Sequence, residues 1–198
     1  MYEIGRIKSV QVQRSSLKIE GRSERYYDPS PLLVVSRLRL TARGVIGITT
    51  EDKQIVDVHH REHPASRNRI DNDISFGFTS HYQAMRDKFG SHLTNGCAGE
   101  NILIETDQEY MLDELGNGVA IQTSMGQLVY LTNIEIAAPC AQFSQFAAQD
   151  IFPLSNQCMK ETLQFLHNGR RGFYATLVDQ QPIEVQAGDS VFAVEQPL

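Results

Sequence analysis

The chain has 198 residues, a hydrophobic content of 41%, a charged content of 21% and a formal net charge of -6. These are ordinary values for a globular protein, and no apolar run approaches the roughly 18 residues that span a bilayer. Nucleic acids and anionic membranes require clustered positive charge, which a net-acidic chain supplies poorly. We therefore expect a soluble protein with no nucleic-acid and no membrane partner, in which any anionic ligand meets a local cluster of arginines.

The N-terminal residues Met1–Arg6 lack the apolar core and cleavage site of a secretory signal. The cysteines are Cys97, Cys140 and Cys158. They are too few and too scattered for a disulfide scaffold, and no Cys-x-x-Cys pair predicts structural zinc. We expect free thiols in a cytoplasmic protein. Residues 1–198 contain no repeat and no linker, so a single domain is predicted.

The first part of the chain predicts strands separated by loops. Residues 4–12 alternate apolar and polar side chains, as a strand with one wet face does. Residues 21–31 are polar and rich in proline, and predict a long surface loop. Residues 32–40 and 54–58 predict strands, with a glycine-flanked bend at residues 44–48 between them.

The segment that follows, from His59 to Arg69, is rich in histidine and arginine. His59 and His63 have the spacing of two zinc ligands on one face of a helix. A β-branched run precedes the pair and Pro64 follows it, so a strand end entering a loop is expected instead. We favour a solvated or substrate-facing loop over a metal site.

Helical spacing recurs in three places. Phe78, Tyr82, Met85 and Phe89 predict an amphipathic helix that ends before Gly90 and packs its aromatic stripe in the core. Residues 141–149 predict a short helix, and Ser155 starts another that closes at Gly169. The apolar stripe of that last helix is formed by Met159, Leu163 and Leu166, with Cys158 and Phe165 on its flank.

Strands outnumber these helices. The remaining predicted strands are residues 102–104, 119–123, 128–136, 173–178 and 190–194, the last two joined by a loop. We predict a mostly β fold with a few α-helices, arranged as a closed β-barrel.

The Pro139-Cys140 step places one thiol at the mouth of the strand that precedes it. This thiol is either an ordinary buried cysteine or the reactive group of a site. Cys97 follows an Asn-Gly step and is a second candidate reactive thiol if it faces solvent, whereas Cys158 is expected to pack within its helix.

The order of several short motifs resembles the MOSC domain, a module of molybdenum-cofactor sulfurases and of small stand-alone bacterial proteins. The likeness covers roughly residues 35–195. It rests on the following motifs in this order: Gly99-Glu100-Asn101 before an apolar strand, Pro139-Cys140, a helix ending near Gly169, Gly172-Phe173-Tyr174, and Gly188-Asp189.

This resemblance implies a mostly β barrel that binds the molybdenum cofactor (molybdopterin) or carries sulfur for it through Cys140, as metal ligand or persulfide. It also implies that Asn101 lies in the cofactor-binding region, with Glu100 beside it. Asn101 and Glu100 have plainer interpretations as a turn-shaping amide and a solvated turn carboxylate.

A thiolate at Cys140 requires positive charge nearby, and the pterin cofactor carries a phosphate that a guanidinium binds bidentately. The candidates are Arg67 and Arg69 in the histidine-rich loop, and Arg170 and Arg171 after the last helix. Arginines at the end of a helix also stabilise its negative end without binding any ligand.

The chain departs from the family at Gly44–Ile48, where the usual Gly-x-x-Gly-Asp lacks its aspartate and no acidic residue appears before Glu51. Three functions therefore stay open. The first is a molybdenum-dependent oxidoreductase acting on a small N- or S-containing substrate, which requires a separate electron-transfer partner. The second is a persulfide carrier that receives sulfur from a donor protein. The third is a non-catalytic ligand-binding or regulatory barrel that has lost the chemistry.

Overall fold

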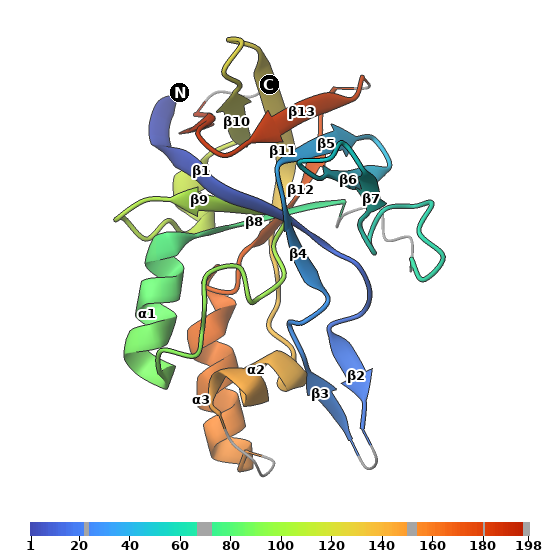
Figure 1. The fold of residues 1–198 in the computed structure, drawn as a ribbon. Helices are drawn as coiled ribbons and strands as arrows, with labels where there is room; N and C mark the ends of the chain where they lie inside the picture. The colour runs from blue at the N-terminus through green and yellow to red at the C-terminus, as the bar shows by residue number, and fades with distance from the viewer. Residues whose placement is uncertain (22–23, 67–72, 150–153, 180, 196–198) are drawn as a thin grey trace.

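The computed structural model describes residues 1–21, 24–66, 73–149, 154–179 and 181–195 (Figure 1). Its centre is a closed β-barrel of seven strands, which confirms the fold class predicted from the sequence. Around the barrel the described strands follow the spatial order β14 (Ser190–Ala193), β10 (Val119–Gln122), β11 (Leu128–Ile136), β12 (Phe173–Leu177), β8 (Ile74–Phe78), β9 (Ile102–Glu105) and β1 (Tyr2–Gln13).

The long strand β1 closes the barrel. One side of β1 pairs antiparallel with β14, with Tyr2 opposite Ala193, and the other side pairs antiparallel with β9. The far end of β1 extends beyond the barrel and pairs with β4 (Leu32–Val35). Among the described strands of the barrel, β8 and β9 are the one pair that runs parallel. The first and last strands of the barrel therefore lie side by side.

The sequence of β12 shows why these segments form barrel strands. Phe173, Ala175 and Leu177 are buried, whereas Tyr174 and Thr176 between them are half-buried. This period of two turns one face of the strand into the core. In the core, the rings of Phe76 and Phe173 stack with centroids 5.3 Å apart.

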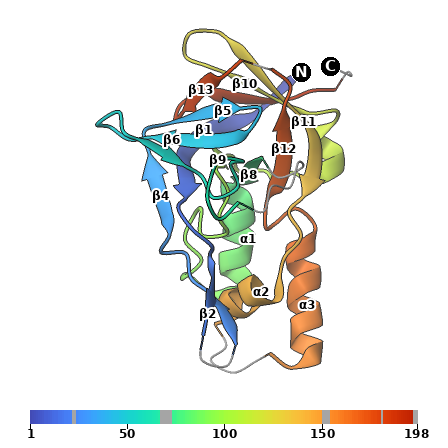
Figure 2. The same ribbon diagram turned by 90° about the vertical axis from the view of Figure 1, so that its right-hand side faces the viewer.

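A second sheet of four strands lies near the upper end of the barrel in Figures 1 and 2. Its strands, in spatial order, are β13 (Ile183–Gln186), β5 (Arg37–Thr41), β6 (Gly44–Ile48) and β7 (Gln54–Val56). Leu38 and Leu40 of β5 are fully buried and join the main core.

The helices gather at the opposite end of the barrel, beside a small hairpin (Figures 1 and 2). In the described ranges these elements are α1 (Thr79–Phe89), α2 (Ala141–Ala147), α3 (Asn156–His167) and the hairpin strands β2 (Lys18–Glu20) and β3 (Arg25–Tyr27). A short 3-10 helix, η1 (Leu112–Leu115), precedes β10 in the chain. A second hydrophobic core fills this helical end and includes Tyr82, Met85, Phe143 and Leu166.

Several sequence predictions are confirmed. The aromatic helix begins at Thr79 and ends at Phe89, and Tyr82 and Met85 are buried as expected. Ser155 caps α3 by accepting from the backbone N–H of Cys158 at 3.2 Å. The segment from His59 into the following turns is non-helical as far as residue 66, as the proline predicted.

Other predictions are wrong in detail. The expected bend at residues 44–48 is the strand β6, and the expected loop at residues 21–31 contains the strand β3. The single strand predicted at residues 32–40 is divided between β4 and β5, and the short helix predicted to reach residue 149 ends at Ala147. The loop expected before residue 190 contains the strand β13.

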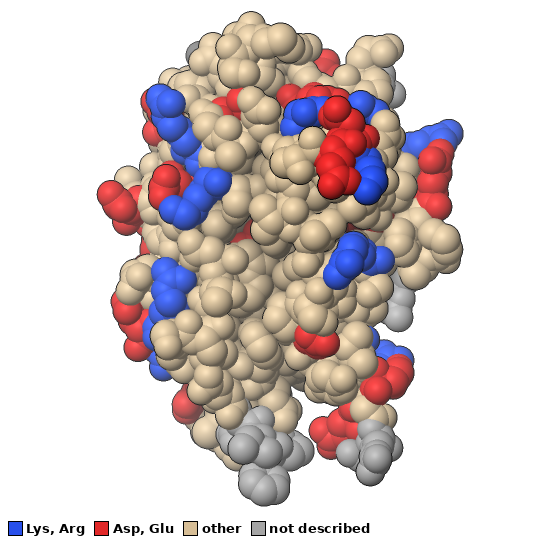
Figure 3. All heavy atoms as spheres, in the orientation of Figure 1, with Lys and Arg blue, Asp and Glu red and all other residues tan. Residues whose placement is uncertain are grey.

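On the face shown in Figure 3, basic and acidic side chains lie intermixed rather than in large patches of one sign. Some oppositely charged side chains pair directly: Arg37 forms ion pairs with Glu184 at 3.0 Å and with Asp52 at 2.7 Å. Among the described residues, no helix has the length and apolarity needed to span a membrane.

Candidate functional site

Cys140 lies between the end of β11 and the start of α2, at the helical end of the barrel. Its backbone is extended, with φ -107° and ψ 161°, and the residue caps α2: Sγ accepts from the backbone N–H of Phe143 at 3.5 Å. The side chain is half-buried and packs against the second hydrophobic core. The thiol therefore keeps access to solvent and accepts one hydrogen bond from the first turn of α2.

Arg171 lies two residues before the start of β12, and Cys140 is among the groups that raise its pKa. It is half-buried, with Nη2 donating to the backbone oxygen of Ala98 at 3.0 Å and Nη1 donating to the hydroxyl of Tyr174 at 3.5 Å. Nε is buried without a hydrogen-bond partner among the described residues. Burial acts to lower the pKa of Arg171, but the surrounding acidic groups, which include Tyr174 and Cys140, outweigh it and raise the pKa.

Glu100 is buried, with 4% of its surface exposed, so the expectation of a solvated turn carboxylate is wrong. Its Oε2 accepts from the hydroxyl of Tyr82 at 2.9 Å, while Oε1 has no partner in the described part of the chain. Burial raises the pKa of Glu100, and Tyr82 and Arg171 oppose only part of that shift. An unpartnered buried carboxyl oxygen is costly and is a common property of functional sites.

Asn101 is buried and its amide is fully used within the protein. Oδ1 accepts from the backbone N–H and the hydroxyl of Ser75, at 3.1 and 2.9 Å. Nδ2 donates to the backbone oxygen of Gln11 at 3.3 Å and to Asp57 Oδ2 at 3.0 Å. Asn101 therefore joins β1, β8 and the segment after β7, and leaves no free amide group for a ligand.

The other candidate arginines are engaged by other protein groups or lie outside the described residues. Arg170 binds Glu109 through Nε at 3.0 Å, and its guanidinium lies over the ring of Phe165 at 4.5 Å. Arg67 and Arg69 belong to the residues that the structure does not describe. Consequently Arg171 is the predicted arginine that the described structure places near Cys140.

The remaining cysteines differ from expectation. Cys97 is 3% exposed, and burial raises its pKa to about 12, so it is not the solvent-facing thiol considered from the sequence. Cys158, expected to pack within its helix, is exposed on α3. Among the described cysteines, Cys140 combines access to solvent with an electrostatic interaction with the half-buried Arg171.

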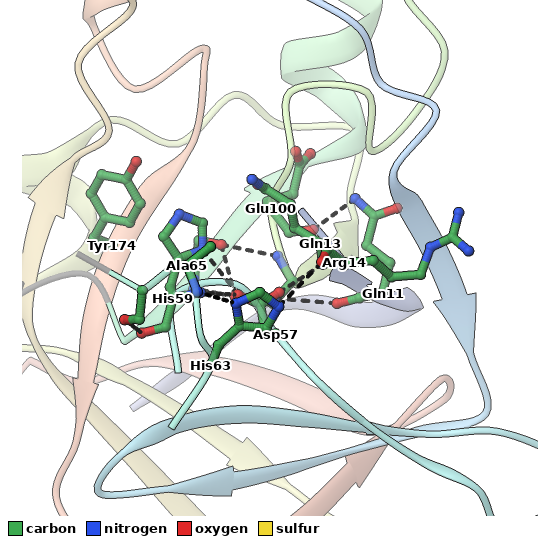
Figure 4. Close-up of polar contacts among 12 residues, drawn as sticks. Gln11, Gln13, Arg14, Asp57, His59, His63, Ala65, Glu100 and Tyr174 are labelled. Atoms are coloured by element: carbon green, nitrogen blue, oxygen red, sulfur yellow. Dashed lines mark hydrogen bonds and ion pairs between the residues drawn. The ribbon is translucent and has the colours of Figure 1, made fainter. Parts of the chain in front are cut away.

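Asp57 and His59 form a hydrogen-bonded pair that was not predicted from the sequence, and Asp57 also contacts Asn101. Asp57 Oδ1 accepts from Nδ1 and from the backbone N–H of His59, both at 2.9 Å (Figure 4). The signal in the sequence is the Asp-Val-His triplet, in which the two side chains are two residues apart. Such spacing is common, and only the fold shows that Asp57 is buried.

The described residues form no cluster of three or more histidine, cysteine, aspartate or glutamate side chains that could hold a metal ion. An open surface cavity of about 330 Å³ is lined by Arg14, Ser15, Ser30 and Pro31, and none of the predicted site residues lines it. Of the residues predicted from the sequence, the structure thus brings together Cys140, Arg171 and Glu100.

Comparison with known proteins gives a likeness in fold. No family model matches the sequence, and no curated protein matches it. The YUAD protein from Bacillus subtilis has 13% sequence identity and a TM-score of 0.56, over 94% of this chain and 93% of that one. YiiM from Geobacillus stearothermophilus has 15% identity and a TM-score of 0.53, over 96% of this chain and 75% of that one. At this level of identity, the likeness to these solved structures concerns the fold alone.

Proposed function

We propose that the protein is a MOSC-type barrel that works through the thiolate of Cys140, as a ligand of the molybdenum in a molybdenum cofactor. The observation that carries this proposal is the environment of the thiol. Cys140 is half-buried, accepts from the N–H of Phe143 at 3.5 Å and lies within the electrostatic reach of the half-buried Arg171. A soft thiolate held in this way suits a transition metal.

The composition of the site restricts which metal species fits. One thiolate does not hold a bare ion, and the described residues offer no cluster of further ligands around Cys140. A metal that arrives with its other ligands already attached is compatible with a single cysteine, and the molybdenum cofactor is such a group. When bound, it would supply a redox-active metal centre.

The protein groups around Cys140 divide into two roles in this proposal. In this proposal Arg171 supplies positive charge near the sulfur, and its hydrogen bonds to Ala98 and Tyr174 keep it in place. Glu100 is buried with one unpartnered oxygen, and burial raises the pKa of its carboxyl group. Asn101 and Arg170 are engaged within the protein and take no part in cofactor binding here.

A sulfur-carrying role is the second candidate, because it requires fewer protein groups than cofactor binding. Nη1 and Nη2 of Arg171 each donate one hydrogen bond to a protein oxygen, so part of the guanidinium is already engaged within the protein. A persulfide on Cys140 requires only the ionised sulfur, its access to solvent and a separate sulfur-donor protein. An oxidoreductase would need an electron-transfer partner in its place.

The test is elemental analysis of the full chain expressed in a host that makes molybdenum cofactor. We compare the wild type with Cys140→Ser and with Cys158→Ser, an exposed cysteine that serves as the matched control. Molybdenum near one equivalent in wild type and Cys158→Ser, and lost in Cys140→Ser, supports the cofactor role. Cyanide-releasable sulfur with the same dependence, and no metal, supports the carrier. Neither in any sample would leave a non-catalytic barrel and refute both roles for Cys140.

A further inference from the structure

The carboxylate of Asp57 is held by an unusually complete set of donors. It is 1% exposed and accepts four hydrogen bonds from protein N–H groups. These donors are the backbone N–H of Gln13 at 2.7 Å, the amide of Asn101 at 3.0 Å, and the backbone N–H and Nδ1 of His59, both at 2.9 Å. Burial acts to raise the pKa of Asp57, but these contacts outweigh it and lower the pKa. The group is therefore an ionised carboxylate.

An ionised carboxylate can only accept hydrogen bonds, so the ring nitrogen of His59 that faces Asp57 must carry a proton. In the neutral ring this leaves Nε2 with the lone pair. The described residues make no hydrogen bond to Nε2, and the side chain of His59 is 36% exposed. Asp57 thus orients the ring of His59 through Nδ1, and Nε2 is left without a partner among the described residues.

The neighbouring histidines of the same loop are used differently. His63 has both ring nitrogens engaged, with Nδ1 accepting from the backbone of Ala65 at 3.1 Å and Nε2 lying 3.2 Å from the backbone oxygen of Arg14. His60 is 2% exposed and its Nδ1 accepts from a backbone N–H. A structural role in holding the loop is therefore assigned to His60 and His63, whereas His59 keeps one nitrogen free.

In the view of Figure 4 the ring of His59 extends from Asp57 in the direction of Tyr174. The hydroxyl of Tyr174 accepts from Arg171, and Cys140 is among the groups that raise the pKa of Arg171. Tyr174 therefore connects this side of Asp57 with the candidate site through Arg171.

We infer that Asp57 and His59 form a proton-transfer pair that serves ligands bound on this face of the barrel, with His59 Nε2 as the base and Asp57 as its positioning residue. In the forward direction Nε2 takes a proton from an N–H, O–H or S–H group of the ligand, and the ring becomes a cation that Asp57 stabilises. The proton then leaves to solvent from the exposed edge. The ligand class is a small molecule with an ionisable protic group, and the inference extends the function proposed for Cys140 to a second chemical group.

The test reads the ring directly and needs no turnover. Nitrogen NMR of the full chain with labelled histidine reports which ring nitrogen carries the proton, and His59→Gln assigns the signal. We expect His59 to be protonated at Nδ1 in the wild type and to lose this preference in Asp57→Asn. Cys140→Ser should leave the signal unchanged, so failure of the Cys140 proposal and failure of this one are distinguishable.

Chemical modification provides the second readout. Diethyl pyrocarbonate attacks a neutral, accessible imidazole nitrogen, and we expect His59 to react about fivefold faster than His63, the factor that one ordinary hydrogen bond represents. Circular dichroism of Asp57→Asn checks that the variant is folded, and His59→Gln, a change at a half-buried side chain, provides the folded reference. A proton on Nε2 of His59 in the wild type, or modification of His59 no faster than His63, would overturn the assignment.

Discussion

His81 of α1 should make the protein sensitive to acid. The side chain is 1% exposed, and neither ring nitrogen has a hydrogen-bond partner among the described residues. The ring packs against Phe78 and Phe173, with centroids 5.3 and 6.2 Å away. Burial lowers the pKa of His81 from 6.5 to about 4, with Glu109 opposing only part of the shift. The folded protein therefore holds this histidine neutral.

The sign of the effect follows from the two protonation steps. The unfolded chain binds a proton at His81 near its ordinary pKa, whereas the folded chain binds it only near 4, so acid favours unfolding. The free energy of unfolding loses about 2 kcal/mol at about pH 5 and about 3 kcal/mol at about pH 4 through this one group. The contribution is fully present above the unfolded pKa and is lost as the pH falls through the folded one.

The assay is urea unfolding of wild type and His81→Leu at a series of pH values between about 7 and 4, where each pKa unit corresponds to about 1.4 kcal/mol. Leucine fills the apolar site without a titrating group, so the stability of the variant relative to wild type should rise as the pH falls. His167→Gln, a change at an exposed histidine of α3, is the control and should follow the wild type. Parallel curves for wild type and His81→Leu would refute the reasoning.

Three further predictions test the packing, two by substitution and one by thiol labelling. Gly169 has φ +81°, and a Cβ there would lie 2.3 Å from the ring of Phe173 in β12, so Gly169→Ala should lower the free energy of unfolding by roughly 3 kcal/mol. Gly126 has φ +79° with nothing within 4 Å of a Cβ, so Gly126→Ala should lower it by only about 1 kcal/mol. Urea unfolding measures both. Tyr82→Phe removes a hydroxyl that donates at 2.9 Å and accepts at 2.9 Å in the helical end, and should cost about 2 kcal/mol; an unchanged unfolding midpoint would contradict its role. Iodoacetamide should label Cys158 in the native protein and reach Cys97, whose pKa is raised to about 12, only after denaturation, as peptide mass spectrometry would report.

The barrel could be predicted because its strands carry local signals. β11 and β9 are runs rich in β-branched residues between turns, and this pattern is visible in the sequence. β6 was mistaken for a bend because glycine usually breaks a strand. Gly47 has a packing reason. A Cβ at this position would lie 2.8 Å from the side chain of Val12, so glycine lets β6 pack against β1 where a residue with a side chain would clash.

The site was predictable in part. Cys140 and Arg171 were identified as candidates from residue type and position, and the fold places them within electrostatic reach of each other. Glu100 accepts a hydrogen bond from Tyr82, 18 residues away in the chain. The carboxylate of Asp57 accepts hydrogen bonds from Gln13 and Asn101, each 44 residues away. Contacts of this range leave no trace in local composition, which explains why both carboxylates were misjudged or missed.

The junction of β1 with β14 has a consequence for how the protein is made. β1 leaves the ribosome before the other described strands, and its hydrogen-bonding partner β14 emerges after all of them. Until then β1 and β10 each present an open row of amide groups to solvent. Such topology predicts late, slow ring closure, with a vulnerable interval in which nascent molecules associate through those rows.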